Sequence, residues 1–315
     1  MLKTLNPKRK KLSKKQKGVY LFVALLLVYP LLQWGVNWLY LNIRTIVLTF
    51  QKYNVATGKY EFWGFEAYKR VFRDLFTPNS GLQTAFKNSY RAIYLNIIIT
   101  VLSVFCSYCL YKKMPGEMFF RVVFMLPTII SAVVLTTLYR NLLSSDFGPL
   151  AKLFDLAMGK EHTSYLSTEN NYLWGLIELY CIWMGLGNSV LLSSTAMFRI
   201  PAEVIESAML DGVGFGGEFI KIVLPLIMPT ISINLLAAFL APAELMMQPM
   251  LIAISGGEQN KYKTFAWYVF DCLRGTESGL IHAATVGIVF TIVNLPLTIS
   301  VTLLRNKIAP DGITF

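Results

Sequence analysis

The chain has 315 residues, of which 55% are hydrophobic and only 15% are charged, and its formal net charge is +11. This is too little polar material to cover a water-soluble globule, so the composition excludes that class and indicates a membrane protein. The basic excess is better explained by anionic lipid than by nucleic acid, because a Lys/Arg cluster lies directly beside an apolar run and no nucleic-acid-binding domain accompanies it.

Apolar runs long enough to cross a bilayer occur six times along the sequence. A hydrocarbon core about 30 Å thick takes roughly 20 apolar residues in helical conformation. The runs cover residues 18–40, 89–111, 119–141, 172–197, 226–254 and 280–304. We therefore predict an all-α membrane protein with six transmembrane helices, because Gly, Pro and Thr inside such helices are tolerated where neighbouring helices satisfy the backbone.

Residues 1–17 form a basic tail with eight lysine and arginine residues. The tail resembles the start of a signal peptide, but the run that follows is long and aromatic and has no small-residue cleavage pattern, which favours a retained anchor. The positive-inside rule places this tail in the cytoplasm, and an even number of spans returns residues 305–315 to the same side. The expected organisation is a tail at 1–17, a transmembrane domain at 18–304 and a tail at 305–315, in the plasma membrane.

The cysteines and histidines do not predict a metal or redox site. Cys106 and Cys109 lie one helical turn apart inside a predicted span, where thiols act as small apolar fillers. The spacing C-x-x-C suggests zinc or redox chemistry in a soluble setting with further ligands, and none is evident. His162 and His282 are too few and too distant in sequence to form a metal site.

A polar block at residues 198–225 separates the fourth and fifth runs and falls on the cytoplasmic side. Pro201 suits the first turn of a helix, and Glu203 and Glu206 lie near its N-terminal end, where the helix dipole favours negative charge. Gly212 follows Asp211 where a C-terminal cap is expected. Apolar residues at 215, 219, 222 and 223 repeat at helical spacing and predict a second, short amphipathic helix. The block is therefore predicted to be a helix-turn-helix.

Physical chemistry alone leaves two interpretations of this helix-turn-helix open. It is either a docking element for a partner protein or an amphipathic segment resting among lipid headgroups. A phosphate-binding loop at GVGFGG is weakly supported, because no strand precedes it and no P-loop lysine with serine or threonine follows.

The sequence IPAEVIESAMLDGVGFGGEFIKIVLPLIMPT, residues 200–230, resembles the EAA signature of permease subunits of ATP-binding-cassette (ABC) importers. The positions that match are Glu206, Ser207 and Ala208 for E-A-A, Asp211 and Gly212 for D-G, and Ile222, Leu224 and Pro225 for the closing I-x-L-P. Ser207 and Val213 replace the usual alanines. The similarity extends over about residues 18–304, and WGFEAYKRVF at 63–72 and FRVVFMLPTIISAVV at 120–134 resemble segments of carbohydrate-type permeases, such as the maltose and glycerol-phosphate permeases. ISGG at 254–257 departs from their T-x-G-G-P signature at Ile254 and Glu258.

The resemblance implies a type I ABC importer permease whose cytoplasmic helices insert into a cleft of an ATPase subunit. The residues implied in ATPase coupling are Glu203, Glu206, Ser207, Ala208, Asp211, Gly212, Leu224 and Pro225. The implied partners are a homologous second permease, two ABC ATPase subunits and an extracytoplasmic solute-binding protein. The chain carries no Walker motif, so the resemblance implies that ATP and Mg²⁺ are bound by the partner ATPases and that this chain has no catalytic residues.

The resemblance also implies a solute site near mid-membrane. The matching positions are Trp183, Gly185 and Asn188 in the fourth run and Glu244, Met247 and Gln248 in the fifth. Aromatic faces, amides and a carboxylate suit hydroxyl-rich solutes. Trp183 and Met247 are residue types that more often serve helix packing, and Asn188 also suits a hydrogen bond to a neighbouring helix. Glu244 requires a partner or water within the membrane, which the solute or the sister permease would provide.

Carbohydrate import is the function that this pattern favours. Import of a different class of solute by the same kind of permease stays open. A stand-alone secondary transporter is less favoured because the two halves show no convincing internal repeat. A membrane-embedded enzyme would need a catalytic constellation within the bilayer, whereas Asp271 and Glu277 lie in a predicted loop.

Overall fold

The computed structural model describes residues 14–144, 148–158, 165–167, 172–253 and 259–308. The chain divides into two compact units, Met1–Ala67 and Tyr68–Phe315. Among the described residues, four helices are long and apolar enough to cross a membrane, and six spans result if each of two bent helix pairs counts as one. The prediction of an all-α membrane protein is confirmed, and a count of six spans agrees with the structure.

The first unit is a long helix followed by a β-hairpin. Helix α1 (Lys14–Gln33), the π-helical turn η1 (Trp34–Tyr40) and α2 (Leu41–Leu48) follow one another without a break. The first span therefore runs from Gly18 to Leu48 and is longer than the predicted 18–40, because the apolar residues of α2 continue the helix. Strands β1 (Gln51–Asn54) and β2 (Lys59–Phe62) pair antiparallel, with Gln51 opposite Phe62.

The second unit begins with short helices that lead into its first membrane helix. The elements are α3 (Glu66–Phe76), which starts at the unit boundary, α4 (Gly81–Ser89) and α5 (Arg91–Tyr111). Ser80 caps α4, because its Oγ accepts the backbone N–H of Gln83 over 3.0 Å. Helix α5 matches the second predicted run closely.

The third predicted run is two helices rather than one straight span. Helix α6 (Glu117–Ile129) and α7 (Ala132–Leu142) are bent by 113° relative to each other. Pro127 removes one backbone donor from the last turn of α6, and Ile130 is extended with ψ 141°. Helix α8 (Pro149–Met158) and the uninterrupted α9 (Leu173–Met197) follow, and α9 matches the fourth predicted run.

The fifth predicted run is also broken. The chain passes through α10 (Ala202–Leu210), α11 (Phe215–Glu218), a π-helical turn η2 (Phe219–Val223), α12 (Leu224–Leu226) and α13 (Met228–Leu240). A bend of 71° separates α12 from α13, and α13 ends in the 3₁₀ turn η3 (Ala241–Ala243), after which α14 (Met247–Ile252) begins. The prolines in this region remove backbone donors and account for its interruptions. The last elements are η5 (Gln259–Tyr262), α15 (Phe265–Leu273) and α16 (Glu277–Ile308).

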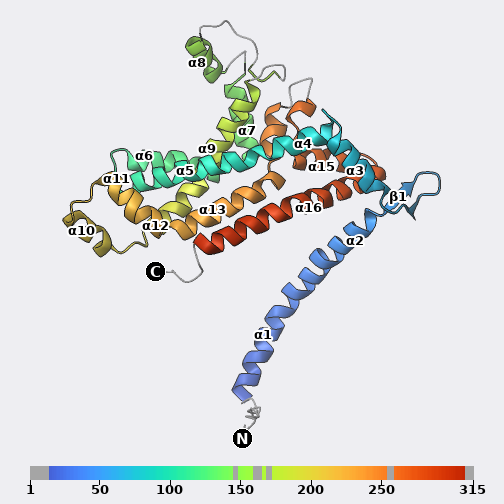
Figure 1. Ribbon diagram of the computed structural model, residues 1–315, viewed down its shortest axis with the longest axis horizontal. Helices are drawn as coiled ribbons and strands as arrows, with labels where there is room; N and C mark the ends of the chain where they lie inside the picture. Colours follow the sequence, from blue (N-terminus) through green and yellow to red (C-terminus); the bar gives the residue numbers. More distant parts are fainter. Residues whose placement is uncertain (1–13, 145–147, 159–164, 168–171, 254–258, 309–315) are drawn as a thin grey trace. The chain divides into compact units, whose positions relative to one another are not determined.

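The long helices of the second unit form a bundle (Figure 1). Helix α5 packs against α9 and α13, and α13 also packs against α16. The α5–α9 contact is close because Gly185 has no side chain: a Cβ there would lie 2.7 Å from Cδ1 of Ile99. The Ser107 hydroxyl donates to the carbonyl of Val190 over 3.0 Å across the same contact. Figure 1 shows α10 to α12 at one end of this bundle and α3, α4 and α15 at the other.

Candidate functional site

Local sequence signals begin and end helix α10. Pro201 is the N-cap residue, with φ −58° and ψ 135°, so the helix begins one residue later than predicted, at Ala202. Gly212 adopts φ +74°, the left-handed conformation predicted for it. The N–H of Gly212 donates to the carbonyl of Met209, and the N–H of Val213 donates to that of Ala208, each over 3.1 Å. These two bonds are the Schellman pattern, which satisfies carbonyls at the end of the helix.

One face of α10 is buried and the other is exposed. Ile205 and Ala208 are each only 6% exposed. The predicted coupling residues that are exposed are Glu203, Glu206, Ser207, Asp211, Gly212 and Pro225, whereas Ala208 is buried and Leu224 is half-buried. Apart from Leu224 and Pro225, all of these residues belong to α10 and the turn that follows it. The exposed part of this set forms an acidic surface with small residues.

The buried face of α10 belongs to a group of side chains that we call the anchor cluster. It joins α5, α9, α10 and the segment that leads into α13. Its buried members are Val104, Tyr108, Met197, Ile205, Val223, Ile227 and Ile231. The cluster includes residues from both sides of the 71° bend, so α10 is attached to the bundle by packing as well as by the chain. The predicted helix-turn-helix is therefore present, with its second helix divided into α11, η2 and α12.

Tyr108 on α5 is the centre of the contact with α11. Its ring centroid lies 4.8 Å from that of Phe215 and 4.8 Å from that of Phe219. Its hydroxyl donates to the carbonyl of Phe215 over 3.1 Å. The tyrosine is fully buried, so a hydrogen-bonded side chain fixes α11 on the end of α5.

An ion pair beside Tyr108 was missed by the sequence analysis. Nζ of Lys112 lies 2.7 Å from Oε2 of Glu218, and Glu218 is only 3% exposed. One feature of the sequence indicated that Glu218 would need a partner. It lies three residues after Phe215 and directly before Phe219, on a predicted apolar face. A carboxylate buried on such a face needs a cationic partner, but the partner lies 106 residues away and only the fold brings it there.

The predicted solute residues of α9 do not share one face of the helix. Trp183 packs against the core around Tyr180, with the two ring centroids 6.2 Å apart. Gly185 faces Ile99 of α5, and Asn188 is exposed. A helix turns by about 100° per residue, which separates Trp183 from the other two positions.

The predicted solute residues of the fifth run lie where the helix is interrupted. Glu244 follows the 3₁₀ turn η3 and is exposed, and Met247 is exposed at the start of α14. Gln248 is half-buried, and its Nε2 lies 3.7 Å from Sδ of Met184 on α9. The structure therefore brings Gln248 beside the part of α9 that carries Trp183 and Gly185. Among the described residues, no hydrogen bond or ion pair joins Asn188 or Glu244 to this group.

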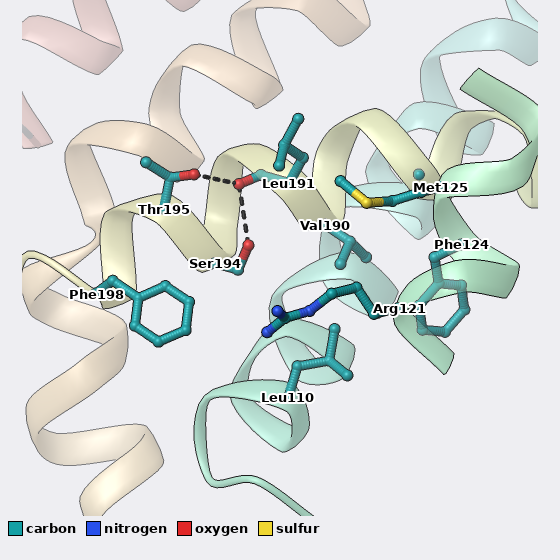
Figure 2. A pocket seen from close by; sticks show the side chains of 10 residues that line it. Leu110, Arg121, Phe124, Met125, Val190, Leu191, Ser194, Thr195 and Phe198 are labelled. Carbon is teal, nitrogen blue, oxygen red and sulfur yellow. Dashed lines mark hydrogen bonds between the residues drawn. The ribbon is translucent and has the colours of Figure 1, made fainter. Parts of the chain in front are cut away.

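A pocket of about 220 Å³ lies between the end of α5, α6 and α9 (Figure 2). It contains none of the predicted solute residues. Arg121, which points into it, pairs with Glu117 at 2.7 Å, and the hydroxyls of Ser194 and Thr195 both donate to the carbonyl of Leu191. Most of the residues that line the pocket are apolar, so it offers mainly apolar surface.

Several further residues have local roles or lie outside the described residues. Glu178 accepts from Arg91 at 2.7 Å and from the hydroxyl of Tyr94, and thereby ties α9 to α5. The four cysteines form no disulfide. Nε2 of His282 lies 3.0 Å from the hydroxyl of Tyr268. His162, Ile254, the rest of the ISGG segment and Glu258 lie outside the described residues.

No family model matches the chain, but the similar proteins reported below are all named as transport permeases. A probable ABC transporter permease of Mycoplasma genitalium is 27% identical over 226 residues, which cover 69% of this chain and 66% of the relative. The multiple sugar-binding transport system permease MsmF of Streptococcus mutans is 24% identical over 76% of this chain and 79% of its own length. The arabinooligosaccharide transport system permease AraP of Bacillus subtilis is 22% identical over 95% of this chain and 91% of its own length.

A solved structure has the same fold. A chain of a bacterial ABC transporter involved in the import of the acidic polysaccharide alginate superposes with a TM-score of 0.77 and 20% identity, over 94% of this chain and 98% of that chain. The fold, the sequence likenesses and the helix-turn-helix agree with one another. The chain is therefore similar in sequence to ABC transporter permeases and shares the fold of a solved one.

Proposed function

We propose that this chain is a permease subunit of an ATP-driven importer for a carbohydrate, either an oligosaccharide or a sugar derivative. The observation that carries the proposal is the geometry of α10. Its exposed face presents acidic and small residues, and its buried face is fixed to the bundle by the anchor cluster. Packed side chains and rigid helices of this kind can carry coupling between an ATPase and a solute pathway.

The carbohydrate assignment is supported by what the relatives are named for. MsmF belongs to a multiple sugar-binding system, AraP to an arabinooligosaccharide system, and the solved structure to an alginate importer. For this chain we propose a solute site that includes Trp183, Gly185, Asn188, Glu244, Met247 and Gln248.

The proposed assembly contains a homologous second permease, two ABC ATPases that bind ATP and Mg²⁺, and an extracytoplasmic solute-binding protein. One support for the last partner is that the alginate transporter was also solved with a pentasaccharide-bound periplasmic protein. We further propose that both termini and α10 lie in the cytoplasm, with the basic tail against anionic lipid. In this assembly the chain itself has no catalytic site.

Purification of the intact complex from native membranes tests the proposal. We expect the chain to co-purify with an ATPase polypeptide, and mass spectrometry of the bound solute to identify a carbohydrate. Uptake into reconstituted vesicles is expected to require ATP and that ATPase. Uptake driven by an ion gradient without any ATPase would contradict the proposal and indicate a secondary transporter, and a bound solute of another class would contradict the carbohydrate assignment.

A further inference from the structure

The ion pair between Lys112 and Glu218 lies where the proposed docking loop meets the bundle. Its Nζ–Oε2 distance is 2.7 Å, and the two side chains are 20% and 4% exposed. The other carboxylate oxygen, Oε1 of Glu218, is buried and has no hydrogen-bond partner among the described residues. Lys112 supplies the positive charge that compensates this carboxylate, and the side chain of Tyr108 also interacts with it.

Each of the two residues lies at the end of a helix, and the two helices are distant in sequence. Lys112 is the C-cap residue of α5, and Glu218 is the last residue of α11. The contacts that hold α11 and the start of η2 on α5 include the ion pair, the hydrogen bond from Tyr108 to Phe215, and the contacts of the Tyr108 ring with Phe215 and Phe219. Ring contacts allow sliding, whereas a buried ion pair and a hydrogen bond fix the register.

Besides the link from α9 at residues 198–201 and the packing of Ile205 in the anchor cluster, two connections lead onward from α10 into the bundle. The connection along the chain passes through the π-helical turn η2 and the 71° bend before α13, both of which depart from regular helix. The connection through space passes from α11 to α5 at Lys112 and Tyr108. Helix α5 packs in turn against α9, which carries three of the proposed solute residues. The connection through space consists of a buried ion pair and a hydrogen bond, whereas the connection along the chain passes through irregular backbone.

We propose that Lys112 and Glu218 are a positioning pair that passes the displacement of α10 directly to α5. This inference rests on the proposed function, because it assumes that an ATPase moves α10. Burial of an ion pair contributes little net stability compared with apolar residues of similar size. What the pair supplies is a fixed register between α11 and α5.

The test uses the complete complex in proteoliposomes and measures ATP hydrolysis with and without the binding protein, purified with its endogenous solute. Lys112→Met and Glu218→Gln are each expected to reduce the stimulation by the binding protein at least about fivefold, the lower end of typical coupling between sites. The exchange Lys112→Glu/Glu218→Lys is expected to recover most of it. Lys113→Met and Glu117→Gln, which remove the same charges nearby, are expected to behave as wild type.

A single variant leaves one charge without its partner and can fail to assemble. The double variant Lys112→Met/Glu218→Leu removes both charges together, so we expect it to assemble and still lose stimulation. Assembled single or double variants with wild-type stimulation would overturn the inference, and so would an exchange variant as low as the single ones. A wild-type complex without an ATPase, or without stimulation, would instead overturn the proposed function.

Discussion

The backbone N–H of Val213 donates to the carbonyl of Ala208 over 3.1 Å, and this bond closes α10 around Gly212. The glycine holds φ +74° at the point where the chain reverses toward α11. Gly212 is therefore the single residue in the left-handed conformation between the exposed residues of α10 and the anchored helix α11.

Replacing that position tests the turn. Gly212→Val puts a β-branched side chain at positive φ, which we expect to destabilise the turn by at least about 1–2 kcal/mol and to reduce co-purification of the ATPase and transport. Gly214→Val is the matched control, because Gly214 has φ −75° and a Cβ there meets nothing within 4 Å. Normal assembly and transport by Gly212→Val would show that the turn has no such role.

Gly187 tests the packing of α6 on α9. A Cβ at this position would meet the carbonyl oxygen of Phe124 and would lie 2.9 Å from Cγ2 of Thr128. Gly187→Ala is therefore expected to lower the free energy of unfolding by about 1–3 kcal/mol. Gly175→Ala on the same helix meets nothing within 4 Å and is expected to preserve or raise stability. Thermal unfolding of the detergent-solubilised proteins distinguishes the two, and equal midpoints would contradict the close approach.

The pair of Arg91 and Glu178 is expected to contribute to stability rather than to solute affinity. The guanidinium carbon of Arg91 also lies 4.6 Å from the ring centroid of Trp174, so one side chain joins two residues of α9. Because both partners are partly exposed, Glu178→Gln is expected to cost up to about 1 kcal/mol. A double-mutant cycle with Arg91→Met measures the coupling. A large change in the KM for transport with unchanged stability would contradict this assignment.

Glu244 tests the proposed solute site. Glu244→Gln removes the charge with little change in volume, and the loss of charged hydrogen bonds to solute is expected to raise the KM for transport roughly tenfold or more. Co-purification of the ATPase is expected to stay unchanged. Glu277→Gln, at the exposed start of α16, is the matched control. Unchanged transport kinetics in Glu244→Gln would remove this residue from the site.

The sequence predicted those features that depend on local pattern. Helix α9 is one uninterrupted apolar run and matches its prediction, and Gly212 lies where a reversal needs positive φ. The breaks in the third and fifth runs were not predicted, because a proline inside an apolar run is compatible with a continuous membrane helix as well as with a bend. The partner of Glu218 could not be predicted, since several lysines were available and only the packing of α11 on α5 selects Lys112. The solute residues remain predictions.

The corner between α6 and α7 has a consequence for what surrounds the protein. A 13-residue helix such as α6 rises only about 20 Å, less than the thickness of the hydrocarbon layer. Pro127 leaves a carbonyl one turn earlier without its usual donor, and Ser131 is exposed at the corner itself. Acyl chains offer no hydrogen bonds to such backbone. Where such backbone lies in the hydrocarbon layer, its neighbours must be water or polypeptide, since lipid cannot satisfy its polar groups.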